Sequence, residues 1–119
     1  MNVISPLIQF QQQLRIFHWQ TISFAEHEAF GKAYESMDDL VDTFVETYMG
    51  RFGRSVPNLT FHILLQPLSA DDVVEKSLVG FTDYLKNMDA EISGETDLLN
   101  IRDEMLGAVH KLKYLLTLK

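Results

Sequence analysis

The sequence contains no cysteine, which excludes disulfides and thiolate metal sites and agrees with a reducing compartment. It also lacks any apolar run near the roughly 20 residues that a membrane-spanning helix needs. Its first residues, MNVISPLIQF, have neither the basic start nor the long apolar stretch of a secretory signal. These absences lead us to expect a cytoplasmic protein that is neither exported nor inserted in a membrane.

Positive charge is also scarce. The chain has 10 lysines and arginines against 17 aspartates and glutamates, which gives a formal net charge of -7. The basic residues are scattered, and Arg51 with Arg54 is the nearest approach to a basic patch. Because an acidic surface repels a phosphate backbone, we do not expect nucleic acid as a partner.

The rest of the composition suits a small globular protein. With 119 residues, of which 46% are hydrophobic and 23% charged, the chain has room for one domain over residues 1–119. No internal repeat or low-complexity tract is visible in it.

Apolar residues recur every three or four positions in four stretches, which is the spacing of amphipathic helices. Ser5 and Pro6 suit the start of the first stretch. Ser23 and Glu26 form a capping box before the second, and Gly50 follows its end. The sequence therefore predicts helices over residues 6–20, 24–49, 70–93 and 96–118. Short turns join the first two and the last two, with a longer crossover between the pairs, so we expect an all-α, ferritin-like four-helix bundle.

The crossover, residues 51–68, contains a short apolar run between Pro57 and Pro67 that shows no long helical phase. We expect a connector with one helical turn or a short extended piece. Its apolar side chains should be covered by the bundle or by another subunit. They are Leu59, Phe61, Ile63, Leu64 and Leu65.

Acidic residues gather along one edge of the second predicted helix. At 100° per residue they lie within about 100° of His27, away from the apolar stripe, and they are Glu35, Asp38, Asp42 and Glu46. His18 ends the preceding helix, so a hairpin would bring the two histidines close. Imidazole with carboxylate is a ligand set that suits iron, manganese or zinc. The alternative is a solvated acidic face.

The other two histidines differ from this pair. His62 and His110 have no acidic residues at helical spacing, and we expect neither of them to belong to a metal site.

Three segments resemble the first half of a Dps-type mini-ferritin, whose signature is a His-Trp pair, a short loop, a His-Glu pair, and an Asp and a Glu four residues apart. They are Phe17-His18-Trp19-Gln20, Ala25-Glu26-His27-Glu28-Ala29-Phe30, and Met37-Asp38-Asp39-Leu40-Val41-Asp42 with Glu46. The resemblance implies a ferroxidase centre, with His18 and His27 from one subunit and Asp42 and Glu46 from a two-fold neighbour. There ferrous iron would be oxidised, preferentially by hydrogen peroxide, and stored as ferric mineral.

The same resemblance implies a homo-oligomer, at least a two-fold dimer and in the family's usual form a dodecameric shell. Iron would be the metal, with zinc or manganese as substitutes. Shortened ferritin-like chains of this kind are also similar to proteins encoded by bacteriophages, so the protein would then act in the cytoplasm of a host cell.

The chain departs from the family pattern in several places. The loop between the histidines is shorter, and the short helix of the crossover is reduced to residues 51–68. An additional aspartate that the family has one turn after the second histidine falls on Gly31. We therefore expect Gly31→Asp to restore a ligand and raise the rate of iron oxidation. Since no lysine-rich tail is seen, DNA protection is not expected.

Three classes of function remain open on this basis. The first is a ferroxidase and iron-storage oligomer. The second is a catalytically degenerate bundle that keeps the symmetric interface and has a structural or ligand-sequestering role. The third is a metal-independent module that sequesters a small ligand or inhibits a host protein. Metal binding would separate the third class from the others, and oxidation kinetics would separate the first from the second.

Overall fold

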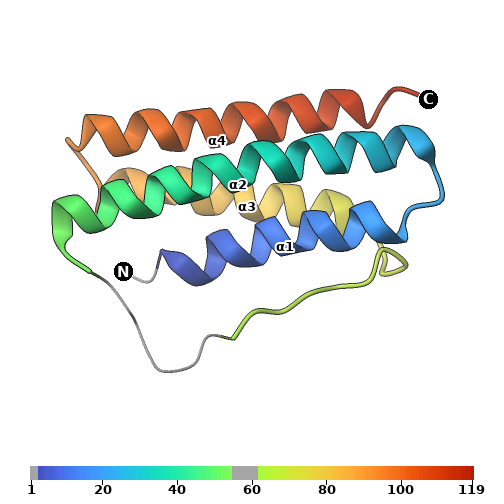
Figure 1. Ribbon diagram of the computed structural model, residues 1–119, viewed down its shortest axis with the longest axis horizontal. Helices are drawn as coiled ribbons and strands as arrows, with labels where there is room; N and C mark the ends of the chain where they lie inside the picture. Colours follow the sequence, from blue (N-terminus) through green and yellow to red (C-terminus); the bar gives the residue numbers. More distant parts are fainter. Residues whose placement is uncertain (1–2, 55–61) are drawn as a thin grey trace.

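Four helices make up most of the computed structural model, which describes residues 3–54 and 62–119 (Figure 1). They are α1 (Ile4–Gln20), α2 (Phe24–Phe52), α3 (Val73–Glu91) and α4 (Thr96–Leu115). The described residues contain no strand, so the all-α prediction is confirmed. Within the same ranges, no helix is both long and apolar enough to span a bilayer.

The four helices form a bundle in which helices that contact each other run antiparallel. Both α1 and α4 pack against α2 and α3. Figure 1 shows α1 and α2 as one hairpin and α3 and α4 as another, and the described part of the crossover runs beside α1 to the start of α3. As a result α2 and α3 point in the same direction.

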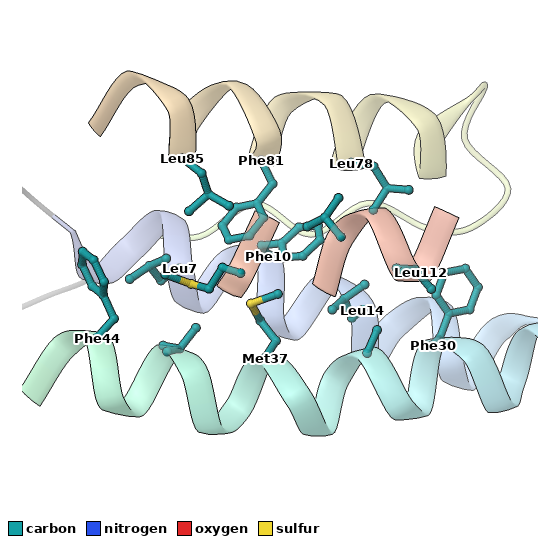
Figure 2. Close-up of a cluster of buried hydrophobic side chains, with 14 of the residues drawn as sticks. Leu7, Phe10, Leu14, Phe30, Met37, Phe44, Leu78, Phe81, Leu85 and Leu112 are labelled. Carbon is teal, nitrogen blue, oxygen red and sulfur yellow. The ribbon is translucent and has the colours of Figure 1, made fainter. Parts of the chain in front are cut away.

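Apolar side chains from all four helices meet in one core (Figure 2). The stripe predicted on α2 supplies Phe30, Met37 and Phe44, each of which is almost completely buried. Phe10 of α1 stacks on Phe81 of α3 with ring centroids 3.9 Å apart. This stack is a principal apolar contact between α1 and α3.

The start of α2 follows the predicted capping box with one change. The Ser23 hydroxyl accepts the Glu26 N–H at 3.2 Å, as expected. The Glu26 carboxylate does not return to the Ser23 N–H and instead accepts the Thr21 hydroxyl at 3.0 Å. Thr21 in turn accepts the Ser23 N–H at 3.1 Å, so the three side chains fix the short turn between α1 and α2.

Several helix ends differ from the predictions. Helix α2 continues through Gly50 and ends at Gly53, whose φ of 94° favours glycine. Helix α1 begins at Ile4, two residues earlier than predicted, so Ser5 lies inside it and Val3 takes the cap position without a side-chain bond. Helix α3 begins three residues later than predicted because Asp72, at φ 51°, is in a left-handed conformation that no helix interior allows.

The described part of the crossover, residues 62–68, is an extended segment that we call the strap. Gln13 makes two hydrogen bonds to the main chain of Gln66: its Nε2 donates to the Gln66 carbonyl and its Oε1 accepts the Gln66 N–H, both at 2.8 Å. Gln9 accepts the Leu64 N–H at 2.9 Å, and Gln20 accepts the Leu68 N–H at 2.7 Å. The expected extended piece is therefore present and is tied to α1 by glutamines.

The bundle does not cover the apolar side chains of the strap, and cover by another subunit, the other expected possibility, stays a prediction. Ile63, Leu64 and Leu65 are all exposed, and Leu64 retains 67% of its accessible surface. Leu59 and Phe61 lie outside the described residues.

Two residues at the α3–α4 side of the bundle, Arg102 and Tyr84, have pKa values that their surroundings shift. Burial opposes the charge of Arg102, but hydrogen bonds to Asp89 and Asp103 outweigh it and raise the pKa of the guanidinium above its ordinary value. Arg102 Nη1 also donates to the Leu85 carbonyl at 2.9 Å and so ties α4 to α3. The Tyr84 hydroxyl is buried without a hydrogen-bond partner in the described ranges, and burial raises its pKa well above the usual value.

Candidate metal centre on the α1–α2 seam

The two predicted histidines stack on each other. His18 lies in the last turn of α1 and His27 in the first turn of α2. Their ring centroids are 3.8 Å apart and their planes differ by 17°. The expectation that the hairpin brings them together is therefore confirmed.

Each histidine binds the backbone of the other. His27 Nδ1 lies 2.9 Å from the His18 carbonyl oxygen, and His18 Nδ1 lies 2.8 Å from the His27 carbonyl oxygen. The last four carbonyls of a helix lack a partner within that helix, and His18 is among them in α1. His27 therefore caps α1, so the pair also has a structural role.

The same two hydrogen bonds fix the tautomer of both rings. A carbonyl oxygen can only accept, so each Nδ1 must carry the hydrogen, and in the neutral ring it is then Nε2 that has the lone pair. Histidines that bind metals usually have this arrangement, in which the second ring nitrogen donates to a carbonyl or carboxylate. The pair thus offers two oriented nitrogen ligands.

Gly31 faces the ring of His18. A Cβ added to Gly31 would lie 3.0 Å from His18 Cε1 and 3.1 Å from His18 Nδ1. These contacts are shorter than carbon atoms tolerate without movement, and the ring is held by its stack and its hydrogen bond. The expectation that Gly31→Asp restores a ligand stays a prediction, and the structure adds that the His18 ring must shift by a few tenths of an ångström to admit the new Cβ.

Polar and aromatic groups continue from the histidines along the outer junction of α1 and α2, which we call the seam. The Arg15 guanidinium lies 4.3 Å from the ring centroid of Tyr34 and 5.5 Å from that of Trp19, and it donates to the Tyr34 hydroxyl. No carboxylate of the described residues is within ion-pair distance of Arg15. Further along, Gln11 donates to Asp38 at 2.5 Å.

The two predicted acidic ligands lie at the other end of α2. Asp42 and Glu46 are exposed and make no side-chain hydrogen bond or ion pair with the described residues. At 1.5 Å per residue, Asp42 is about 22 Å from His27 along the helix. Accordingly, the described part of one chain holds no group of three or more His, Asp or Glu side chains able to bind a metal. A single copy brings together the histidines but not the acids.

The histidine end of the seam is also rich in exposed apolar side chains. Trp19 is 65% exposed, Phe24 is 76% exposed, and Ile22 between them is fully exposed. Exposed groups of this kind are typical of a surface that contacts another protein. His62 and His110 are exposed, on the strap and on α4 respectively.

Two features of the site region escaped the sequence analysis. Arg15 was not singled out, because its stack depends on aromatic rings from two different helices. The glutamines that bind the strap were also missed, although Gln9, Gln13 and Gln20 recur on one face of α1.

Comparison with known proteins gives a family and a relative. Residues 18–116 match a family described as DUF5856, a family of unknown function. The chain is also similar to an uncharacterized 14.6 kDa protein from the mobD-ri intergenic region of Enterobacteria phage T4. The two are 27% identical over 106 residues, which cover 86% of this chain and 75% of the phage protein. No solved structure matches the chain.

Proposed function

The chain belongs to the DUF5856 family, and we propose that this member has a metal site between two copies of the chain. Ferrous iron would bind and be oxidised there. His18 and His27 of one copy and Asp42 and Glu46 of the other would be the ligands. The observation that carries this proposal is the histidine pair, in which both Nδ1–H groups are held by carbonyls and both Nε2 atoms are left for a metal.

The distribution of charge along the seam supports pairing of two copies. One end carries His18 and His27 beside Glu26 and Glu28, Arg15 lies against Tyr34 near the middle, and the other end carries Asp42 and Glu46. When two copies meet antiparallel, the histidines of each copy face Asp42 and Glu46 of the other, and Arg15 faces the acidic edge of the other α2. With a two-fold axis near Glu35, position 27 of one copy lies opposite positions 42 to 46 of the other. This is the arrangement that the metal site needs.

The fold and the relatives add further support. Two helical hairpins joined by one long connection is the connectivity of ferritin-like proteins. The resemblance to Dps-type mini-ferritins implies the same four ligands and the same division between subunits. The similarity to a phage T4 protein supports a role in the cytoplasm of an infected host. The resemblance to mini-ferritins implies a dimer as the minimal unit and a dodecameric shell as the larger form.

The proposed chemistry is the oxidation of two ferrous ions by one hydrogen peroxide, which gives two ferric ions and two hydroxides. Iron is the substrate of this reaction. Imidazole nitrogens would hold the ferrous ion, and the carboxylates would stabilise the higher charge of the ferric product. Zinc and manganese suit the same ligands and would occupy the site without turnover.

The first test uses a substitution that separates metal binding from helix capping. His27→Asn keeps an amide N–H close to the position of Nδ1, so it can still cap α1, but it has no counterpart of Nε2. Titration calorimetry with zinc or with anaerobic ferrous iron should show at least tenfold weaker binding, about 1.4 kcal/mol. His110→Asn, on the exposed face of α4, is the matched control and should bind as the wild type does. Absence of divalent metal uptake by the wild type would refute the proposal.

A mixing experiment tests whether the ligands come from two copies. His27→Asn and Asp42→Asn should each bind metal weakly when alone. In a mixed dimer, one of the two sites combines the intact histidines of one chain with the intact acids of the other. Co-refolding the two variants should therefore recover tight sites, whereas a site within one chain would recover none.

A second candidate is the degenerate bundle that binds metal without turnover, and Gly31 favours it. The ring of His18 fills the space where the family's additional acid would begin, so the centre has fewer carboxylates than the resemblance implies. Stopped-flow measurement of ferric absorbance with peroxide distinguishes the two. Oxidation no faster than in protein-free buffer, together with tight zinc binding, would select this second candidate.

A further inference from the structure

A second concave surface lies on the opposite side of α1 from the seam. It is a groove of about 640 Å³ between α1, the strap and α3. Phe10 and Phe81 contribute their stacked rings to it, and Val73 of α3 and Leu64 of the strap line its sides. This volume is within the range of about 300–1,000 Å³ that is typical of small-molecule sites.

Two features keep the groove open. The glutamine bonds hold the strap against α1, so it cannot close over α3. Gly80 of α3 has no side chain to fill the space, and a Cβ built there would have no atom within 4 Å. Leu64 therefore keeps most of its apolar surface in water, where an apolar ligand would gain by covering it.

Lys76 is the basic side chain among the described residues that line the groove. Lys76 and Ser77 line it from the first turn of α3, and no carboxylate in the described ranges is within ion-pair distance of Lys76. Gln9 adds its side-chain amide. Asp71 is the one carboxylate that lines the groove, and it opposes a ligand of high negative charge. One lysine near one aspartate suits a single negative charge better than a phosphate dianion.

The shape of the groove favours a linear ligand. On α3 its lining extends from Val73 to Tyr84, which is about 16 Å along the helix. The charged residues are at the Lys76 end, and the far end is formed by Pro6, Gly80 and Tyr84. A ligand with a charged head and an unbranched apolar tail matches this distribution.

We propose that the groove between α1, the strap and α3 binds a medium-chain fatty carboxylate, with the carboxylate at Lys76 and the acyl chain along Phe10, Phe81 and Leu64. This site is separate from the proposed metal centre. It needs neither a second copy of the chain nor a metal ion.

The shape of the site is tested with a pair of matched glycine substitutions. Gly80→Leu fills the groove, whereas Gly107→Leu adds the same side chain to an exposed position of α4 that has equally free space. Calorimetric titration of dodecanoate, in EDTA and below its micelle concentration, should show binding to the wild type and to Gly107→Leu. Gly80→Leu should lower the affinity at least tenfold while circular dichroism stays unchanged. Equal binding by both variants, or no binding by the wild type, would overturn the proposal.

The charge of the ligand is tested by a second pair of variants. Lys76→Gln should weaken dodecanoate binding at least fivefold and Asp71→Asn should strengthen it, because they remove an attraction and a repulsion respectively. Binding of dodecanol, which has the same chain and no charge, should change less than twofold in either variant. Dodecyltrimethylammonium that binds more tightly than dodecanoate would show that the site selects cations and would contradict the proposal. Because all titrations contain EDTA, failure here leaves the metal site unaffected.

Discussion

Gly31→Ala tests the geometry of the histidine pair directly, since it adds one methyl group at the point of closest approach to His18. The new Cβ would lie 3.0 Å from Cε1 and 3.1 Å from Nδ1 of the ring. Carbon atoms prefer separations of about 3.5–4.0 Å, so the ring must move by a few tenths of an ångström. Any such movement strains the hydrogen bond to the His27 carbonyl and the ring stack.

Two opposing effects set the change in the free energy of unfolding that Gly31→Ala causes. Replacing a helix-interior glycine by alanine stabilises a helix by about 1 kcal/mol, and Gly107→Ala on α4 should show that gain because nothing lies within 4 Å of its Cβ. At Gly31 the same gain is opposed by overpacking, which costs about 1–3 kcal/mol. We expect the free energy of unfolding of Gly31→Ala to range from equal to that of the wild type to about 2 kcal/mol below it.

Urea unfolding of the two glycine variants measures this difference. The free energies of unfolding of Gly31→Ala and Gly107→Ala should differ by about 1–3 kcal/mol, and the histidine ring resonances should shift only in the first. Gly31→Asp adds a larger side chain at the same place, so on steric grounds it should weaken zinc binding, whereas a restored ligand would strengthen it. If Gly31→Ala were as stable as Gly107→Ala, or Gly31→Asp bound zinc more tightly than the wild type, the steric argument would be refuted.

Three other substitutions test separate parts of the structure. Arg15→Glu places a negative charge where an antiparallel copy presents its acidic edge, so sedimentation equilibrium should show at least tenfold weaker dimerisation. Tyr84→Phe should reduce the loss of stability above about pH 10. In the wild type the unfolded chain ionises Tyr84 near that pH, whereas burial keeps the hydroxyl protonated in the folded protein, so rising pH favours unfolding; urea unfolding at several pH values checks this. Arg102→Met should lower the free energy of unfolding by about 1–3 kcal/mol, since it loses the bonds that join α4 to α3, while Asp89 and Asp103 stay solvated at 69% and 62% exposure.

Much of the fold could be predicted because it depends on local patterns. The apolar stripe of α2 determined which face is buried, and the Ser23 cap located the start of the helix. Helix ends were less predictable, because a glycine within a helix costs only about 1 kcal/mol, which packing along α2 can offset. Gly50 is such a position, and Gly53 ends the helix because its conformation has a positive φ.

The candidate site was predictable only in part. The histidines flank a short turn, so their proximity follows from the chain itself. Gly31 could not be interpreted in the same way, because its role depends on the ring of His18, which reaches it from another helix. The hydrogen bonds between the glutamines and the strap could not be predicted either, because Gln13 and Gln66 are distant in sequence and nothing local indicates that they meet.

The attachment of the strap to α1 has a consequence for how this protein can vary. Every bond that the glutamines make is to a main-chain N–H or C=O of the strap, groups that any residue except proline provides in full. The side chains at positions 63, 64 and 65 can therefore change in size or polarity while the strap keeps its place. One wall of the groove can acquire new ligand preferences through substitutions that leave the helical scaffold unaltered, much as a variable loop does on a constant framework.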